Sequence, residues 1–291
     1  LWSFMDRLTS LLPAAFQWTR LASLAMLSAV VGVFDVVGCD PARDHSSSLG
    51  RSERGAFDGA GVGGEGGKPF SDAEFAVVRG QMVDDLATSI RDERVLDALR
   101  KVPRHEFVPV AQRSRSYHDV PLPVSEGQTI TRPLIVALMT ELLELDGSER
   151  VLEVGTGSGY QASVLAELAA EVFTVEIKAD SSAAAKDKVG GLQGRGLVRD
   201  ARVTFVVGDG NKGHPPGAPY DAILVTAAAS RVPEALQSQL KPNGRLVIPV
   251  GDNYFQELLL VTKDDKGEVF ERSMKLVRLI KLQEKGSGRE E

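Results

Sequence analysis

The sequence predicts an α/β fold with a doubly wound, mostly parallel sheet. The first observation is a buried strand at residues 151–154, followed by three alternating glycines and an apolar-periodic helix over residues 161–170. The second is a series of short apolar runs separated by helical or turn segments. These runs place strands at residues 172–176, 203–207, 221–226, 245–250, 258–263 and 275–282, with a helix at 232–240 and the last two strands antiparallel around residues 265–267.

Two helices precede this region and are expected to cover the sheet. Ser71 and Glu74 have the spacing of a capping box, in which each side chain satisfies a free backbone N–H of the other residue. Apolar residues then recur at helical spacing as far as Ile90. A second helix is expected over residues 92–101, before Pro103.

The glycines at positions 155, 157 and 159 predict a nucleotide-type site. Glycine lets the backbone turn sharply and lets a ligand approach N–H groups at a helix start. The dinucleotide pattern G-x-G-x-x-G is not met, because its sixth position is Tyr160. The next strand ends in Glu176, and an acid at that place can accept hydrogen bonds from ribose hydroxyls. A turn with a structural role only is the alternative, and the strand-end acid disfavours it.

The composition is that of an ordinary globular protein. The 291 residues are 43% hydrophobic and 25% charged, enough for one large domain or two small ones. A net charge of −6 without a basic block argues against nucleic acid as the main partner. One cysteine excludes an internal disulfide framework, and with four scattered histidines it offers no zinc-ligand spacing.

An apolar run at residues 21–37 precedes the predicted domain. It is short for a membrane span and suits the core of a signal peptide, although Asp35 interrupts it. The run ends in V-V-G-C at residues 36–39, which resembles a bacterial lipobox, whose cysteine (here Cys39) is lipidated after cleavage. Lipidation of Cys39 would anchor the protein in the cell envelope.

Residues 40–70 are rich in Gly and Ser, as expected of a flexible tether. The alternative to a leader is an over-extended reading frame, because the chain starts at Leu1. The expected organisation is a leader at 1–39, a linker at 40–70, one domain at 71–285 and a disordered tail at 286–291.

Hydroxyl side chains lie just before a helix expected over residues 133–145. Pro133 suits the first helical turn, and Thr131 suits the N-cap. In a purely structural role, Thr131 would cap the helix. In a functional role, its hydroxyl and the free N–H groups at the helix start would hold a carboxylate. His105 and His118 lie in proline-punctuated loops and are expected to be structural hydrogen-bonding residues.

Five motifs, in this order, resemble the protein-L-isoaspartate (D-aspartate) O-methyltransferase family. They are D-E-R-V-L at residues 92–96, P-R-H-E-F-V-P at 103–109, G-Q-T-I-T-R-P at 127–133, L-E-V-G-T-G-S-G-Y-Q at 152–161 and Y-D-A-I-L-V-T-A-A at 220–228. The resemblance covers residues 71 to 282. The run at 127–133 separates this family from other S-adenosylmethionine (SAM) methyltransferases.

The resemblance implies a seven-stranded sheet of the class I SAM methyltransferase type, with SAM as cofactor. Substrates would be isoaspartyl- and D-aspartyl-containing proteins and peptides, methylated on the free carboxylate to begin their repair. The enzyme is expected to be a monomer that binds no nucleic acid and no metal.

The resemblance also implies roles for single residues. Thr131 stands where the family has a serine, regarded as the active-site residue, and keeps its hydroxyl while stiffening χ1. Glu176 would hold the ribose, and Glu153 with the glycine loop would shape the methionine end. The full set of implied cofactor-binding residues is Thr129, Ile130, Glu153, Gly155, Thr156, Gly157, Gly159, Glu176, Asp209, Gly210 and Gln256, with Asp209 and Gly210 at the adenine.

Two further positions depart from the family pattern. Asn211 follows the Gly-Asp-Gly loop, where bacterial members usually have an aromatic residue. The final strand ends in L-I-K-L at residues 279–282 instead of F-V-P-L, in a segment that shapes the family's peptide site. The peptide preference of this chain therefore stays open.

Two alternative functions fit the sequence less well. A SAM methyltransferase of another substrate class is disfavoured by the run at 127–133, and residues 227–229 are A-A-A where many nucleic-acid adenine methyltransferases carry D/N-P-P-Y. A non-catalytic envelope binding protein would fit the leader, because SAM is made in the cytosol. Cofactor supply favours the cytoplasm, with a lipoprotein anchored through Cys39 as the alternative.

Overall fold

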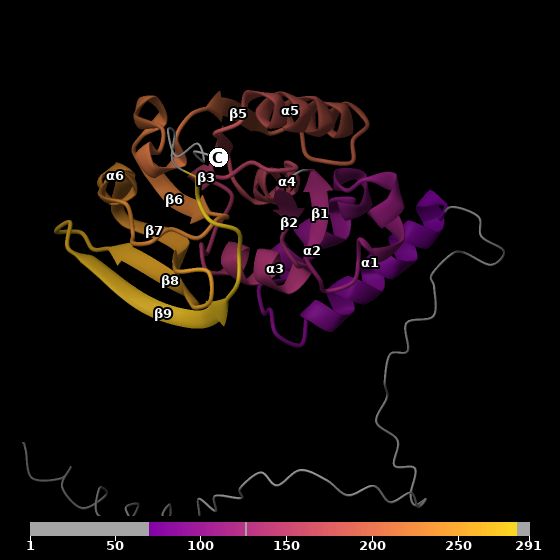
Figure 1. The fold of residues 1–291 in the computed structure, drawn as a ribbon, viewed down its shortest axis with the longest axis horizontal. Coiled ribbons are helices and arrows are strands. Elements are labelled where there is room, and N and C mark those ends of the chain that lie inside the picture. Colours follow the sequence, from indigo (N-terminus) through magenta and orange to yellow (C-terminus); the bar gives the residue numbers. More distant parts are fainter. Residues whose placement is uncertain (1–69, 126, 284–291) are drawn as a thin grey trace, which may run out of the picture. The chain divides into compact units, whose positions relative to one another are not determined.

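Seven strands form one sheet in the order β5-β4-β3-β6-β7-β8-β9 (Figure 1). The pairs β5-β4, β4-β3, β3-β6 and β6-β7 are parallel, and β7-β8 and β8-β9 are antiparallel. This arrangement confirms the predicted doubly wound, mostly parallel sheet. The bounds are β3 (Arg150–Val154), β4 (Glu171–Glu176), β5 (Arg202–Val207), β6 (Tyr220–Val225), β7 (Leu240–Gly251), β8 (Gln256–Lys263) and β9 (Val269–Val277).

The structure is a computed structural model that describes residues 70–125 and 127–283. The predicted leader, Cys39, the linker up to residue 69 and the tail at 286–291 lie outside the described residues. Within the described part, no helix has the length and apolar content needed to span a bilayer.

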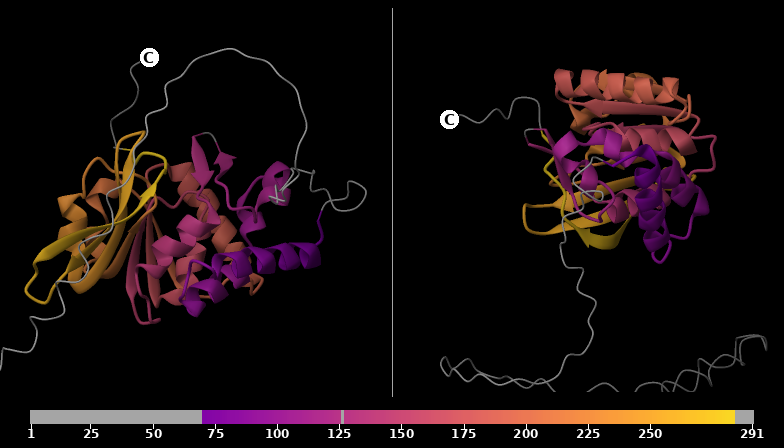
Figure 2. Two further views of the ribbon diagram at one scale, coloured as in Figure 1. Left: turned by 90° about the horizontal axis from the view of Figure 1, so that it is seen from below. Right: turned by 90° about the vertical axis from the view of Figure 1, so that its right-hand side faces the viewer.

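Helices cover both faces of the sheet (Figure 2). One core contains Val151 together with residues of α1 (Asp72–Leu86), α2 (Glu93–Lys101), α3 (Pro133–Glu141), α4 (Tyr160–Leu168) and α5 (Ala179–Gly194). The other core contains Leu152 and Leu236, the latter from α6 (Glu234–Gln239), which packs against β7. Because successive side chains of a strand point to opposite faces, neighbouring residues of β3 serve different cores.

Two predicted loops contain short regular elements. Residues 103–109 include a 3-10 helix, η1 (Arg104–Phe107), followed by η2 (Val110–Arg115). Residues 122–130 form an antiparallel pair, β1 (Leu122–Ser125) with β2 (Gln128–Ile130), which sequence reasoning missed. Further 3-10 turns, η3 (Gly210–Lys212) and η4 (Pro215–Gly217), follow β5. Each of these elements is too short to show a hydrophobic period.

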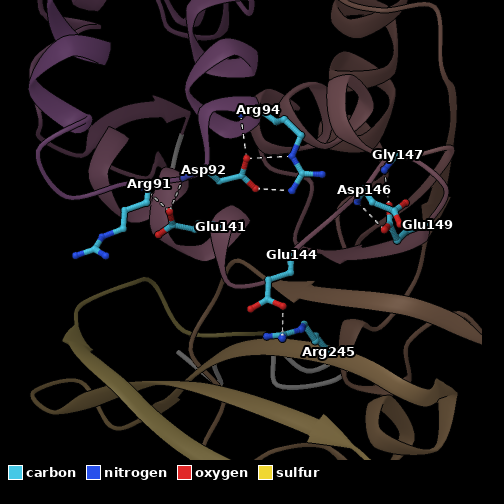
Figure 3. A network of polar contacts seen from close by, with 9 residues as sticks. All are labelled: Arg91, Asp92, Arg94, Glu141, Glu144, Asp146, Gly147, Glu149 and Arg245. Atoms are coloured by element: carbon cyan, nitrogen blue, oxygen red, sulfur yellow. Dashed lines mark hydrogen bonds and ion pairs between the residues drawn. The ribbon is translucent and has the colours of Figure 1, made fainter.

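Both N-terminal helices form, although α1 ends at Leu86 and not at Ile90, and the segment between them is bonded to the end of α3. Ser71 and Glu74 make the predicted capping box of α1. The Glu141 carboxylate accepts hydrogen bonds from the backbone N–H groups of Arg91 and Asp92, at 2.6 and 2.9 Å (Figure 3). Beyond α3, Glu144 pairs with Arg245 of β7 (Figure 3). This polar network connects the helical cover to the sheet.

The expected bounds of several elements were wrong. β7 begins at Leu240, where the sequence suggested residue 245. The last strand was placed at residues 275–282, but β9 is Val269–Val277, and the following segment leaves the sheet to pair with Ala228 through Lys281. The helix expected over 133–145 ends at Glu141. β9 lies at the sheet edge with mostly exposed side chains, so its first six residues show neither an apolar run nor a regular alternation.

The turn after β3 is close-packed at Gly155. This residue has φ +96°, and a Cβ on it would lie 2.4 Å from the Thr226 hydroxyl oxygen. That hydroxyl donates to the Gly155 carbonyl at 2.7 Å, while Gly155 N–H donates to the Val175 carbonyl at 2.8 Å. The ends of β3, β4 and β6 are therefore joined at one residue that has neither the space nor the backbone conformation for a side chain.

Gly155→Ala is expected to lower the free energy of unfolding by about 2 kcal/mol, because it combines left-handed backbone with a steric clash. Gly190→Ala is the matched control, since Gly190 lies in α5 with nothing within 4 Å of its Cβ position. That control is expected to gain up to about 1 kcal/mol from helix propensity. Urea unfolding of both variants measures the difference, and equal midpoints would contradict this account of the turn.

Candidate functional site

A pocket opens at the carboxyl ends of β3, β4 and β6, where an α/β sheet of this kind binds ligands. Four parts of the chain line it. They are residues 127–131 before α3, the glycine loop with the start of α4, residues 175–178 after β4, and residues 280–283 of the C-terminal segment. The lining is completed by Val136, Met139, Val154, Gly210, Thr226 and Ala227. Segments far apart in the sequence therefore meet around one cavity.

The pocket brings together most of the residues singled out in the sequence. Its lining includes Thr129, Ile130, Thr131, Gly155, Thr156, Gly157, Glu176 and Gly210, and it leaves out Glu153, Gly159, Asp209 and Gln256. The four residues outside it lie directly behind or beside the lining, and their contacts show what each one supports.

Glu176 lies at the end of β4 with its carboxylate held by backbone groups. Gly157 N–H donates to Oε2 at 3.0 Å, and Lys178 N–H donates to Oε1 at 3.1 Å. Each oxygen keeps lone-pair capacity for a further donor. Glu176 can therefore accept hydrogen bonds from neighbouring hydroxyls of a ribose, and its position fits the expectation for SAM.

Glu153 is fully buried behind the glycine loop. Thr174 donates a short hydrogen bond to its Oε2, and its Oε1 has no hydrogen-bond partner among the described residues. Burial, with a smaller contribution from the nearby charge of Glu176, raises the pKa of Glu153 to about 8. Glu153 therefore supports the pocket from behind instead of lining it.

Two more of the expected residues have local structural roles. Asp209 caps η3, where its Oδ1 accepts from Asn211 N–H at 3.0 Å. Gly159 begins α4 with φ +84°, and a Cβ there would meet Val189 of α5 at 3.0 Å. Gly159 therefore permits close packing of α4 against α5, while its neighbours in the loop face the pocket.

Thr131 lines the pocket, but it is not the N-cap of α3. The cap position belongs to Arg132, whose side chain makes no capping bond. Instead, the Asp119 carboxylate accepts from Leu134 N–H at 2.9 Å and pairs with Arg132. A carboxylate of the chain itself thus accepts from one of the N–H groups that the sequence suggested for a ligand, and Thr131 belongs to the pocket lining.

Gln256 ties down the C-terminal segment. Its Oε1 accepts from Leu279 N–H at 2.6 Å, and its Nε2 donates to the Leu279 carbonyl at 3.0 Å. The next residues are held by Ala228, which donates to the Ile280 carbonyl at 2.7 Å and accepts from Leu282 N–H at 2.9 Å. Gln256 thus places residues 280–283 over the pocket. Sequence reasoning missed these lining residues individually, although it singled out their segment as a departure from the family.

His105 has the structural role expected of it. Its ring stacks on Phe75 with centroids 3.9 Å apart, and its Nδ1 lies 2.7 Å from the Tyr117 hydroxyl. Burial lowers the pKa of His105 to about 4, so the ring is neutral at physiological pH. It lies outside the pocket lining.

A doubly wound sheet with a glycine loop and a strand-end acid around one cavity is typical of nucleotide-cofactor sites, and the seven-stranded order with antiparallel strands at one end fits the class I SAM-dependent methyltransferase type. The protein-L-isoaspartate (D-aspartate) O-methyltransferase family model matches residues 79–287. A Methanopyrus kandleri protein-L-isoaspartate O-methyltransferase is 50% identical over 206 residues, covering 69% of this chain and 89% of the relative. A Geobacter metallireducens enzyme of the same name is 45% identical over 220 residues, covering 75% and 99%. The chain belongs to the protein-L-isoaspartate O-methyltransferase family, whose cofactor is SAM.

Solved structures agree with this family. A protein-L-isoaspartate O-methyltransferase has a TM-score of 0.61 and 30% identity, covering 70% of this chain and 65% of the solved one. A Plasmodium falciparum protein described as the same kind of enzyme was solved with S-adenosyl-L-homocysteine and has a TM-score of 0.60. At 24% identity, with coverage of 70% and 98%, this second likeness supports the fold.

Gln256→Ala is expected to release the C-terminal segment. Loss of the two hydrogen bonds to the Leu279 backbone should speed amide hydrogen exchange at Leu279 and its neighbours by at least about tenfold. Gln239→Ala is the control, because Gln239 is also a buried glutamine that bonds backbone groups, but those of Lys212 and His214. Unchanged protection at residues 279–282 in the Gln256 variant would contradict the tether.

Proposed function

We propose that this chain transfers a methyl group from SAM to the free carboxylate of L-isoaspartyl and D-aspartyl residues in damaged proteins, and that Thr131 orients that carboxylate. The observation that carries the proposal is that residues 127–131, from the family's distinguishing run at 127–133, meet the glycine loop and Glu176 around one pocket. The cofactor supplies an electrophilic methyl group on a sulfonium, which leaves as a neutral thioether.

The reaction does not require a general acid or a general base from the protein. A substrate α-carboxylate has a reference pKa of about 3.5, so it is already ionised at pH 7. What the protein contributes is position, because alignment of reacting groups is worth roughly 7–11 kcal/mol. A site without a general base suits this chemistry.

Each part of the pocket has a task in this proposal. The Thr131 hydroxyl donates a hydrogen bond to the substrate carboxylate, since this side chain lies in the lining beside Thr129. Glu176 holds the ribose hydroxyls, and the loop from Gly155 to Gly157 holds the methionine end. Gly210, which lines the pocket next to Asp209, contacts the adenine.

The proposed partners are flexible isoaspartyl-containing segments, because only an exposed and mobile stretch can bring its carboxylate into the pocket. We further propose that residues 71–285 are the catalytic domain, that it acts as a monomer, and that it works in the cytoplasm, where SAM is made. Anchoring through Cys39 in the cell envelope is the alternative, and Cys39→Ser with cell fractionation tests it.

Thr131→Ala is expected to lower turnover on an isoaspartyl peptide by about 10- to 100-fold, the loss of one hydrogen bond to a charged group. SAM affinity should stay within about twofold of the wild type, because the methyl donor is held by other segments. Thr131→Ser is the matched control and should retain activity. Single-turnover methylation and equilibrium SAM binding measure both effects, and unchanged turnover in the Ala variant would remove Thr131 from the mechanism.

A further inference from the structure

Three buried side chains form a continuous hydrogen-bonded chain that ends in the pocket. The Glu153 carboxyl group accepts from the Thr174 hydroxyl, and the Thr174 and Thr156 hydroxyl oxygens lie 2.6 Å apart. Glu153 and Thr174 are fully buried, and Thr156 belongs to the pocket lining. Thr174 was not among the residues that the sequence singled out.

Ionisation of Glu153 fixes the direction of this chain, whereas a neutral carboxyl group can instead donate its own proton to the Thr174 oxygen. A threonine hydroxyl has one proton to donate, so it cannot donate in both directions along the chain. When Glu153 is ionised, Thr174 must donate to it and Thr156 must donate to Thr174. The Thr156 oxygen then presents only lone pairs to the pocket and favours a ligand that donates hydrogen bonds, such as an ammonium group.

We infer that Glu153, Thr174 and Thr156 form a hydroxyl relay that couples ionisation of Glu153 to binding of the α-ammonium group at the amino-acid end of the cofactor. This inference rests on the proposed use of SAM in the pocket. Thr174 is a positioning residue here, because it acts on the ligand only through Thr156. The proton that leaves Glu153 on binding goes to the solvent.

The surroundings of Glu153 favour its neutral form until a cation binds. Burial is the main cause of its raised pKa, and Glu176 on β4 adds like-charge repulsion. Other titratable groups on the packed elements lie elsewhere: Asp221 is at the opposite end of β6, and Tyr160 of α4 lies against Arg104. A group with pKa about 8 is mostly protonated at pH 7. Binding of a cation at Thr156 therefore causes the Glu153 carboxyl group to release its proton.

The sign of the pH dependence follows from this linkage. The ligand prefers the ionised form of Glu153, so apparent affinity is reduced below the pKa of the free protein and rises as pH approaches it. Between pH 6.5 and 8.0 the affinity for S-adenosyl-L-homocysteine is expected to rise about tenfold. The ligand 5′-methylthioadenosine lacks the amino-acid end and should show no such rise.

Isothermal titration calorimetry of the full chain with S-adenosyl-L-homocysteine, in buffers of different ionisation enthalpy, tests the relay by counting protons. At pH 7 the wild type should release most of one proton per ligand bound. Glu153→Gln, which keeps the shape of the side chain but cannot ionise, should release none. Thr174→Val should lose most of the release, and Thr174→Ser should restore it.

Two results would overturn the relay. One is normal ligand binding by the wild type without proton release, and the other is equal release by the wild type and Glu153→Gln. Release by 5′-methylthioadenosine equal to that by S-adenosyl-L-homocysteine would equally overturn the assignment to the ammonium group. Failure of the wild type to bind S-adenosyl-L-homocysteine at all would contradict the proposed function itself, which separates the two failures.

Discussion

The close contact between Gly155 and Thr226 is the constraint on which the site depends. It fixes where β3 ends, because a side chain at position 155 would occupy the space of the Thr226 hydroxyl. The same turn bonds to the Val175 carbonyl, so three parallel strands end at one level. Gly157 N–H and the Glu176 carboxylate then lie within hydrogen-bond distance of each other. A cofactor that contacts both the glycine loop after β3 and Glu176 at the end of β4 requires these strand ends to be aligned.

Support for the pocket comes from buried polar groups behind its lining. The chain from Glu153 through Thr174 to Thr156 joins two neighbouring strands beneath the glycine loop. On the other side, Gln256 holds the C-terminal segment by its backbone. Buried polar groups are costly unless they are paired, so each such contact restricts the chain to one arrangement. Positions that are far apart in sequence thereby become parts of one binding surface.

The sequence predicted the parts of the fold that carry strong local patterns. Buried strands such as β3 and β6 are short apolar runs, and the capping box at Ser71 is a local signal. β9 was misplaced because an edge strand with exposed side chains has no such run. The pair β1-β2 was missed for a similar reason, since three or four residues cannot display a period.

The candidate site was predictable to the extent that its residues are adjacent in the chain. The glycine loop and the run at residues 127–133 could be recognised from spacing and resemblance. The direction in which a side chain points could not be recognised from the sequence. Glu153 was therefore expected in the pocket, but it lies behind it. The bond between Asp119 and the start of α3 and the tether between Gln256 and Leu279 join residues many positions apart. Only the folded chain reveals contacts of this kind.

The most direct measurement is transfer of labelled methyl from SAM to an isoaspartyl peptide by the full chain, with the aspartyl peptide of identical sequence as control. The account predicts base-labile label on the isoaspartyl peptide alone, because a carboxyl methyl ester hydrolyses in base and only the isoaspartyl linkage presents the required free α-carboxylate. Equal labelling of both peptides, or no label on either while SAM is bound, would contradict it.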